Sequence, residues 1–316
     1  MKVYEKESLE QLKKKTVRTL AGIPHISGDV SPFRYPGGKG KLSRFLAYFL
    51  VSNDLVGSRL VEPFCGGAGG TLPLLEAGLI DRLVLNDLNP AMYSFWYSVK
   101  HHPDELIRLI RSEPVNIDAW HYWRDVYSDS SSSIIERGFS AFFLNRTNRS
   151  GILPTGPIGG RMQTGDYKID CRFNKPSLEK RVENIALLSD KIDVHSMDAS
   201  ILISDFSDED DFIYADPPYV KEGKNIYKKF CFDDELHRSF SETIKRASSK
   251  WLISYDDHPL VHSLYSKSGI NVVEFSYVMN RARVGRELLI ASSHLTLPVM
   301  PTSTIKSQVE LSHACM

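Results

Sequence analysis

The tetrapeptide Asp216-Pro217-Pro218-Tyr219 directly follows the apolar run Phe212-Ile213-Tyr214-Ala215, which predicts a buried strand. This arrangement suits one chemical problem, which is to make the weakly nucleophilic amine of a nucleobase accept a methyl group. A fixed carboxylate and a backbone carbonyl hold the two amine hydrogens and localise the lone pair electrostatically. The prolines stiffen the turn, and Tyr219 offers a flat face for an extruded base. Taken alone, the tetrapeptide also fits a proline turn that closes an ordinary strand.

A second segment, Leu60 to Thr71, predicts a short strand that enters a glycine-rich loop, Gly66-Gly67-Ala68-Gly69-Gly70, with a helix after it. Glycines let the backbone approach a ligand closely and adopt positive φ at little cost. Another apolar run ends at Asn86-Asp87, about 20 residues after the loop. Together these features form a nucleotide-binding pattern in which the terminal acid holds ribose hydroxyls. The same pattern is found in nicotinamide-dependent dehydrogenases, but such an enzyme leaves the Asp-Pro-Pro-Tyr turn unexplained.

The basic loop Arg34 to Lys41 precedes a predicted helix over Leu42 to Leu50. The loop does not have P-loop spacing, which needs four residues between the first glycine and the Gly-Lys-Ser/Thr end. Lys39 is suited to pair with a ligand carboxylate, and Tyr35 to pack on a cationic or adenine group. A solvated basic turn is the alternative interpretation.

These segments, in this order, resemble the D12 class (alpha order) of adenine-specific DNA methyltransferases, relatives of the Dam methylase. The likeness runs from about Ser31 to Ser293 and is least evident over Leu153 to Cys171. The segments that carry it are Tyr35 to Lys39, Glu62 to Gly69, Asn86-Asp87, Phe142 to Gly151, Asp216 to Tyr219, Trp251 to Asp256 and Glu287 to Ile290.

The resemblance implies a Rossmann-like α/β methyltransferase fold with a helical and hairpin insertion for target recognition. It implies methyl transfer from S-adenosylmethionine to the 6-amino group of adenine at a specific site in double-stranded DNA, with the base flipped out. Asp216, Pro217, Pro218 and Tyr219 would be catalytic. The residues expected to contact the cofactor are Tyr35, Lys39, Glu62, Phe64, Gly66, Gly67, Gly69, Asp87 and Asp216. We expect no metal, and a companion restriction endonuclease is left open.

Three other functions stay open at this point. A cytosine-N4 methyltransferase would need the same chemistry on a different base. A non-catalytic DNA-binding protein on the same scaffold would explain the fold, although it would not need an intact Asp216 to Tyr219 motif. RNA is the other nucleic acid that such an enzyme could modify.

The chain divides by its patterns into a catalytic domain with one insertion. The predicted boundaries are an N-terminal extension over 1–30, a cofactor-binding half over 31–100, a target-recognition insertion over 101–185, a second catalytic half over 186–296 and a tail over 297–316. Within the insertion, positive charge suits phosphates and guanine edges. The residues expected to contact DNA are Arg146, Asn148, Arg149, Arg161, Lys168 and Arg172. A solvated long loop is the alternative.

Three further predictions concern the second catalytic half and its contact with the first. Asp233-Asp234 predicts the start of a helix whose Leu236, Phe240 and Ile244 lie on one face. In open α/β sheets, ligands bind beyond the carboxyl ends of the strands at the topological switch point. If the strands that end at Phe64 and Asp216 are neighbours, the glycine loop and the catalytic turn therefore face one pocket. Further strands are expected over Trp251 to Tyr255, Ile270 to Phe275 and Leu288 to Ala291.

Composition is compatible with these expectations. The chain has 316 residues, and its 39 Lys and Arg balance 39 Asp and Glu, so no overall basic field attracts nucleic acid. The four cysteines are scattered without paired spacing, which indicates a reducing compartment rather than a disulfide framework or zinc site. No apolar stretch approaches the ~20 residues of a membrane span, and the polar start is no signal peptide. We therefore expect a soluble, cytoplasmic protein without membrane partners.

Overall fold

The structure is a computed structural model of the chain. It describes residues 23–27, 30–34, 40–206, 208–221, 232–265, 272–280, 283–293 and 295–298; within these ranges the side chains of residues 40, 41, 272–280 and 283–287 are left out. Within these ranges, no helix is long and apolar enough to cross a membrane.

Seven strands form one sheet in the order β3-β2-β1-β4-β5-β7-β6. Neighbouring strands are parallel except around β7, which runs antiparallel to both β5 and β6. This order confirms the predicted Rossmann-like α/β fold, because the chain winds outward from β1 in one direction and from β4 in the other. The strands are β1 (Arg59–Glu62), β2 (Arg82–Asn86), β3 (Ile192–His195), β4 (Asp211–Ala215), β5 (Lys250–Asp256), β6 (Val272–Asn280) and β7 (Arg283–Ala291).

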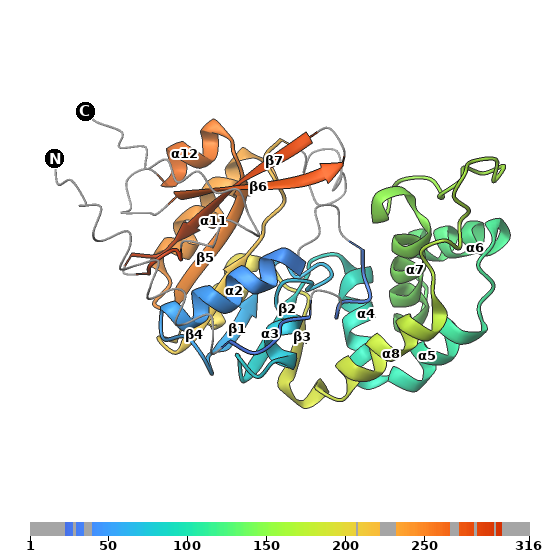
Figure 1. The fold of residues 1–316 in the computed structure, drawn as a ribbon, viewed down its shortest axis with the longest axis horizontal. Helices are drawn as coiled ribbons and strands as arrows, with labels where there is room; N and C mark the ends of the chain where they lie inside the picture. The colour runs from blue at the N-terminus through green and yellow to red at the C-terminus, as the bar shows by residue number, and fades with distance from the viewer. Residues whose placement is uncertain are drawn as a thin grey trace.

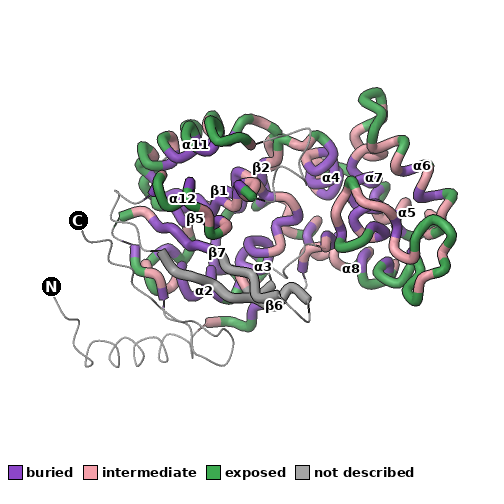
Figure 2. The backbone as a smooth tube through the Cα atoms, turned by 90° about the horizontal axis from the view of Figure 1, so that it is seen from above, coloured by how far each residue is buried: buried purple, intermediate pink, exposed green. Residues whose placement is uncertain are grey.

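Both faces of the sheet are buried, which explains why its central strands read as continuous apolar runs. On β4, Phe212 and Tyr214 pack into a core on one face, whereas Ile213 and Ala215 pack into a second core on the other. The same alternation on β1 sends Leu60 to the first core. Figure 2 shows the buried residues concentrated in the central strands, with exposed residues along the outer side of α11 and over the distant part of the helical insertion.

Helices cover the two faces and also build a separate lobe beside the sheet (Figure 1). The first core is completed by α2, α3 and α4, and the second by α9, α11 and α12. The helices are α2 (Gly40–Ser52), α3 (Leu72–Glu76), α4 (Pro90–His101), α5 (Pro103–Ser112), α6 (Ile117–Ser128), α7 (Ile134–Thr147), α8 (Lys175–Ala186), α9 (Ala199–Asp205), α11 (Asp234–Arg246) and α12 (Pro259–Tyr265), with short 3-10 turns η1 (Arg149–Gly151) and η2 (Ser189–Lys191).

Asp233 accepts hydrogen bonds from the backbone N–H groups of Glu235 and Leu236, so the predicted start of α11 is confirmed. The predicted face is only partly right. Phe240 and Ile244 are buried, but Leu236 is 41% exposed. His237 takes the buried position one residue further along, because the helix presents the i, i+3, i+4, i+7 stripe to the sheet.

Helices α5 to α8 form a lobe between α4 and β3 in the sequence, and α4 packs it onto the sheet (Figure 1). Helix α7 begins with a capping box between Ser133 and Glu136. It then crosses α4 so closely that a Cβ on Gly138 would lie 2.6 Å from the backbone nitrogen of Phe95. Glycine at position 138 therefore lets α7 of the lobe pack directly against the backbone of α4.

Candidate active site

The carboxyl ends of β1 and β4 form the centre of the site. The two strands are parallel neighbours, with Val61 paired to Ile213. Continuing this register sets Phe64 beside Asp216 at the edge where the sheet order reverses. The prediction that these two strands are neighbours is therefore confirmed, and the glycine loop and the Asp-Pro-Pro-Tyr turn leave the sheet side by side.

The glycine loop after β1 is held by hydrogen bonds at Gly66 and Gly67, two of the residues predicted to contact the cofactor. Gly66 has a φ of 46°. Its N–H donates to Asp87 Oδ2 at 3.0 Å, and its carbonyl accepts from the indole N–H of Trp96 at 2.7 Å. The carbonyl of Gly67 accepts from the hydroxyl of Ser31. The loop backbone is thus fixed, and Gly66 and Gly69 are half-buried at its surface.

Two buried polar side chains tie this loop to the sheet. Glu62, at the end of β1, is 4% exposed, and its carboxylate accepts a hydrogen bond from Thr71 directly before α3. The side-chain amide of Asn86 donates to the carbonyls of Pro63 and Met197 at 2.9 and 3.0 Å. Glu62, which was predicted to contact the cofactor, therefore lies beneath the loop and supports its shape.

Asp87 follows β2 and is half-buried. Both of its oxygens accept backbone N–H groups, Oδ2 from Gly66 and Oδ1 from Asn89. Burial raises the pKa of Asp87 from 3.8 to about 6, while the two N–H donors act in the opposite direction. The carboxylate is therefore an acceptor that titrates near neutral pH beside the glycine loop.

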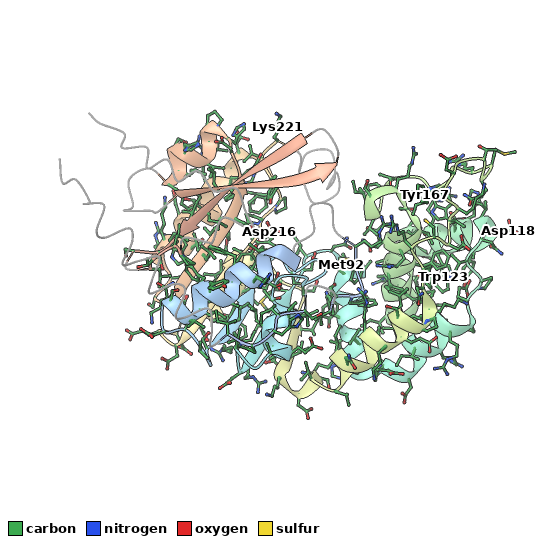
Figure 3. The ribbon with its side chains drawn as sticks, viewed as in Figure 1. Met92, Asp118, Trp123, Tyr167, Asp216 and Lys221 are labelled. Atoms are coloured by element: carbon green, nitrogen blue, oxygen red, sulfur yellow. The ribbon has the colours of Figure 1, made fainter. Side chains whose placement is uncertain are left out.

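Asp216 lies directly after β4 and is half-buried; Figure 3 shows it on the sheet-bearing half of the molecule. Its Oδ1 accepts a hydrogen bond of 2.7 Å from the hydroxyl of Ser254 on β5. The turn that follows is held by Asp256 at the end of β5. That carboxylate accepts from the backbone N–H groups of Val220 and Lys221, each at 3.0 Å. The neighbouring strand thus fixes both the acid and the turn.

The remaining predicted residues of this site surround the same edge. Pro217 is buried, and Pro218 and Tyr219 are half-buried. The Phe64 ring makes edge contacts with Phe232 and Phe240, with ring centroids 5.6 and 5.3 Å apart. Tyr35 and Lys39 lie outside the described residues.

The segment before Tyr35 is nevertheless well anchored. Asn145 on α7 pairs with both backbone groups of Arg34: its Oδ1 accepts the N–H at 2.7 Å and its Nδ2 donates to the carbonyl at 2.8 Å. The same Nδ2 donates to the carbonyl of Gly151 at 2.7 Å. A Cβ on Gly151 would lie 2.7 Å from the Arg34 carbonyl oxygen, so glycine is required there. The helical lobe therefore holds Arg34, the residue directly before the segment Tyr35 to Lys39.

The residues predicted to contact DNA all lie in the lobe, away from the sheet edge. Arg149, Arg161, Lys168 and Arg172 are exposed. Arg146 is half-buried, and its guanidinium donates to the backbone carbonyls of Arg172 and Pro32.

The prediction for Asn148 is wrong. Its side chain is fully buried, accepts from the indole N–H of Trp120 at 2.6 Å, and donates to the carbonyls of Ile152 and Leu153. Both polar atoms of the amide have partners inside the protein. Asn148 therefore shapes the loop that carries Arg149.

Several residues of the site were not singled out by sequence reasoning. Ser254 and Asp256 fall in the strand whose family resemblance was noted, but only the fold shows what they hold. In the lobe, the side-chain amide of Gln163 donates to the carbonyls of Ile158 and Gly160 and accepts from the N–H of Ile169, and so it holds the tip of the loop between these residues. The tip presents Met162 and Tyr167, which are 84% and 68% exposed; Figure 3 shows Tyr167 on the upper side of the lobe.

Comparison with known proteins gives the site its chemical context. The family model of the D12 class N6 adenine-specific DNA methyltransferases matches residues 35–279. The chain is 22% identical to the type II methyltransferase M.MjaIII of Methanocaldococcus jannaschii, over 80% of this chain and 93% of that protein. It is 24% identical to the type II methyltransferase M1.LlaDCHI of Lactococcus lactis subsp. cremoris, over 78% of this chain and 88% of that protein.

A solved structure described as that of a candidate RNA methyltransferase from Pyrococcus horikoshii aligns over 89% of this chain and 94% of its own, with 14% identity and a TM-score of 0.36. The fold assignment rests instead on the strand order and on the family match, which extends from the Tyr35 loop past the Asp216 turn to β6. On these grounds the chain belongs to the D12 class of N6 adenine-specific DNA methyltransferases.

Proposed function

We propose that this adenine-specific DNA methyltransferase uses S-adenosylmethionine as its methyl donor and acts on an adenine flipped out of double-stranded DNA. One observation carries the proposal: β1 and β4 are neighbours, so the glycine loop and the Asp216 turn emerge at the same edge. A donor held by the loop and an amine held by the turn would then meet, and positioning of this kind supplies much of a rate acceleration.

In this proposal the Asp216 carboxylate and the carbonyl of Pro217 accept the two hydrogens of the adenine 6-amino group. Two fixed acceptors localise the nitrogen lone pair and favour its attack on a methyl group. Tyr219 stacks on the base. The exposure of Asp216 is intermediate, which supports this role because the carboxylate combines a firm support from Ser254 with access from outside.

The residues near the glycine loop fit the proposed cofactor. When bound, S-adenosylmethionine supplies a methyl group on a positively charged sulfur. Ribose carries adjacent hydroxyl donors, and the carboxylate of Asp87 is the matching acceptor at the end of β2. The positive φ of Gly66 turns the backbone sharply at this point, and Phe64 brings an apolar face to the same edge.

For DNA we propose the exposed basic residues of the lobe. Arg34 and Arg172 support this assignment, because burial and the neighbouring charge of Arg172 lower the pKa of Arg34. Two cations held close together favour an anion such as phosphate between them. The two relatives are named type II methyltransferases, and on that basis we propose a defined target sequence; a companion restriction endonuclease is left open. Action on DNA also agrees with the predicted cytoplasmic setting.

The test is an Asp216→Ala variant assayed for incorporation of tritiated methyl groups into DNA. We expect incorporation to fall below detection while the variant keeps its fold and still binds the cofactor. Asp190→Ala is the matched control, because Asp190 is exposed and precedes β3, at the opposite end of the parallel strands from Asp216. Mass spectrometry of the digested product identifies the base. Undiminished incorporation by Asp216→Ala, or N4-methylcytosine as the product, would overturn the proposal.

A further inference from the structure

We infer that Ser254, supported from behind by Tyr214, is a positioning residue that holds the Asp216 carboxylate in the orientation in which it accepts an amine hydrogen. The inference rests on the proposed role of Asp216. Neither Ser254 nor Tyr214 touches the base in this account, and both act through Asp216.

The sheet itself brings these three side chains together. Strands β4 and β5 are parallel, with Tyr214 paired to Leu252 and Ala215 to Ile253, so the next step of the register sets Asp216 opposite Ser254. Tyr214 and Asp216 are two residues apart and therefore lie on the same face of the sheet. The hydroxyl of Ser254 is 2.7 Å from Asp216 Oδ1 and 3.0 Å from the hydroxyl of Tyr214.

The direction of each hydrogen bond follows from counting hydrogens. An ionised carboxylate only accepts, so the single hydroxyl hydrogen of Ser254 points to Asp216. The contact between the two hydroxyls must then be donated by Tyr214 to Ser254. The result is a chain of donors that runs from the core toward the reacting edge. Each bond in such a chain polarises the next, which strengthens the bond to the charged end.

Burial makes this chain rigid. Ser254 is 0% exposed and Tyr214 is 1% exposed, so water does not compete for the hydroxyls. Ser254 is also fixed on its other side, where it pairs with Leu289 of β7. The carboxylate of Asp216 is thereby supported from a central strand rather than from a loop, and a carboxylate that rotates freely would present its acceptor to the amine only part of the time.

A different residue holds the backbone of the turn. Asp256 binds the N–H groups of Val220 and Lys221, several residues beyond the catalytic acid. Removing the Ser254 hydroxyl therefore leaves the turn anchored and changes the support of one side chain. This separation makes the inference testable by a single-atom deletion.

The experiment compares Ser254→Ala and Ser254→Thr with the wild-type enzyme in single-turnover methyl transfer, because product release does not then mask the chemical step. Tyr214→Phe is included as a milder change that keeps the buried ring. The matched control is Ser98→Ala, which also removes a buried hydroxyl that donates a hydrogen bond, in this case to the carbonyl of Ser94 on α4.

We expect the single-turnover rate of Ser254→Ala to fall roughly 10- to 100-fold, the usual effect of deleting a hydrogen bond to a charged group. The KM for DNA and the affinity for S-adenosylhomocysteine should stay within about twofold of wild type, since positioning acts on the chemical step. Ser254→Thr should recover most of the rate, and Tyr214→Phe should lose less than Ser254→Ala.

Three results would overturn the inference: a wild-type rate in Ser254→Ala, a loss expressed only in KM, or an equal loss in Ser98→Ala. These failures are distinct from failure of the proposed function. Failure of the proposed function would be seen instead in the Asp216→Ala variant, which has an unchanged Ser254 and would then keep its methyl-transfer activity.

Discussion

Cofactor binding should weaken as the pH falls below neutrality, because the proposed ribose acceptor titrates in that range. Burial raises the pKa of Asp87 to about 6, whereas an ordinary aspartate in water titrates near 3.8. Ribose hydroxyls donate more strongly to an ionised carboxylate than to a protonated carboxyl group, which keeps only part of its acceptor capacity. Cofactor binding should therefore favour the deprotonated form of Asp87.

The size of the pH effect on cofactor binding follows from the pKa of Asp87. With a pKa of about 6, the carboxylate is almost fully ionised at pH 8 but only ~9% ionised at pH 5. The dissociation constant of S-adenosylhomocysteine, a stable probe, should therefore rise by up to about 10-fold between these two pH values. An aspartate that titrates at 3.8 would change the same constant by only ~6%. The two cases are readily separated.

The direction of the linkage gives a second observable. Because the pKa of Asp87 is raised in the folded cofactor-free protein, protonation of Asp87 stabilises the fold. This contribution to stability is complete below pH 3.8 and is lost as the pH rises through about 6. Hydrogen bonds from the ribose favour the ionised form, so binding near pH 6 should release protons. Isothermal titration calorimetry in buffers of different ionisation enthalpy measures both the affinity and the protons released.

The control is Asp87→Asn, which should bind the probe more weakly and lose the part of the pH dependence due to this residue. The amino group of the probe titrates equally with both proteins, so the difference between them isolates Asp87. Circular dichroism at pH 5 and 8 checks that both stay folded. A wild-type affinity that does not change over this range, or an identical pH slope in Asp87→Asn, would refute the proposed role.

Two further predictions concern the contacts of α7. Gly138→Ala should lower the free energy of unfolding by about 1–3 kcal/mol in urea titrations, because its Cβ would meet the Phe95 backbone at 2.6 Å; a more stable variant would contradict this close crossing. Asn145→Ala should weaken S-adenosylhomocysteine binding by at least about fivefold, since the residue holds both backbone groups of Arg34 before the Tyr35 loop. Calorimetry beside Asn116→Ala, which removes only the N-cap of α6, tests it, and equal affinities in the two variants would argue against the link.

The central strands were predictable because burial on both faces leaves continuous apolar runs such as Phe212 to Ala215. The edge strand β3 was not predicted. Most of its residues are half-exposed, and its sequence Ile-Asp-Val-His alternates apolar and polar residues instead of forming an apolar run. The hairpin of β6 and β7 extends further than its apolar residues suggested. Pairing such as Ser276 with Arg286 continues beyond the core, and cross-strand backbone hydrogen bonds do not need apolar side chains.

Site residues that belong to a motif at the end of a strand could be predicted from the sequence. Site residues that contact a partner from another strand or helix could not. Asn148 stands among arginines in the sequence, which favoured a DNA contact, yet its side chain is buried and accepts a hydrogen bond from Trp120 of another helix. Ser254 is an ordinary serine in an apolar strand, and only the register of β4 and β5 brings it to Asp216. Pairings of this kind depend on the strand order, which no local pattern states.

Three acids illustrate this limit, because each ends or follows a strand at the same edge of the sheet. Asp256 accepts the backbone N–H groups of Val220 and Lys221, so it supports the turn that follows Asp216. Asp87 also accepts two N–H groups, but burial raises its pKa to about 6, so it is poised to respond to a ligand that donates hydrogen bonds. Asp216 is supported by a hydroxyl from the neighbouring strand. The sequence supplies the same residue type in the same position three times. The donors that the fold brings to each carboxylate separate the structural role of Asp256 from the roles proposed for Asp87 as a cofactor acceptor and for Asp216 as a catalytic acid.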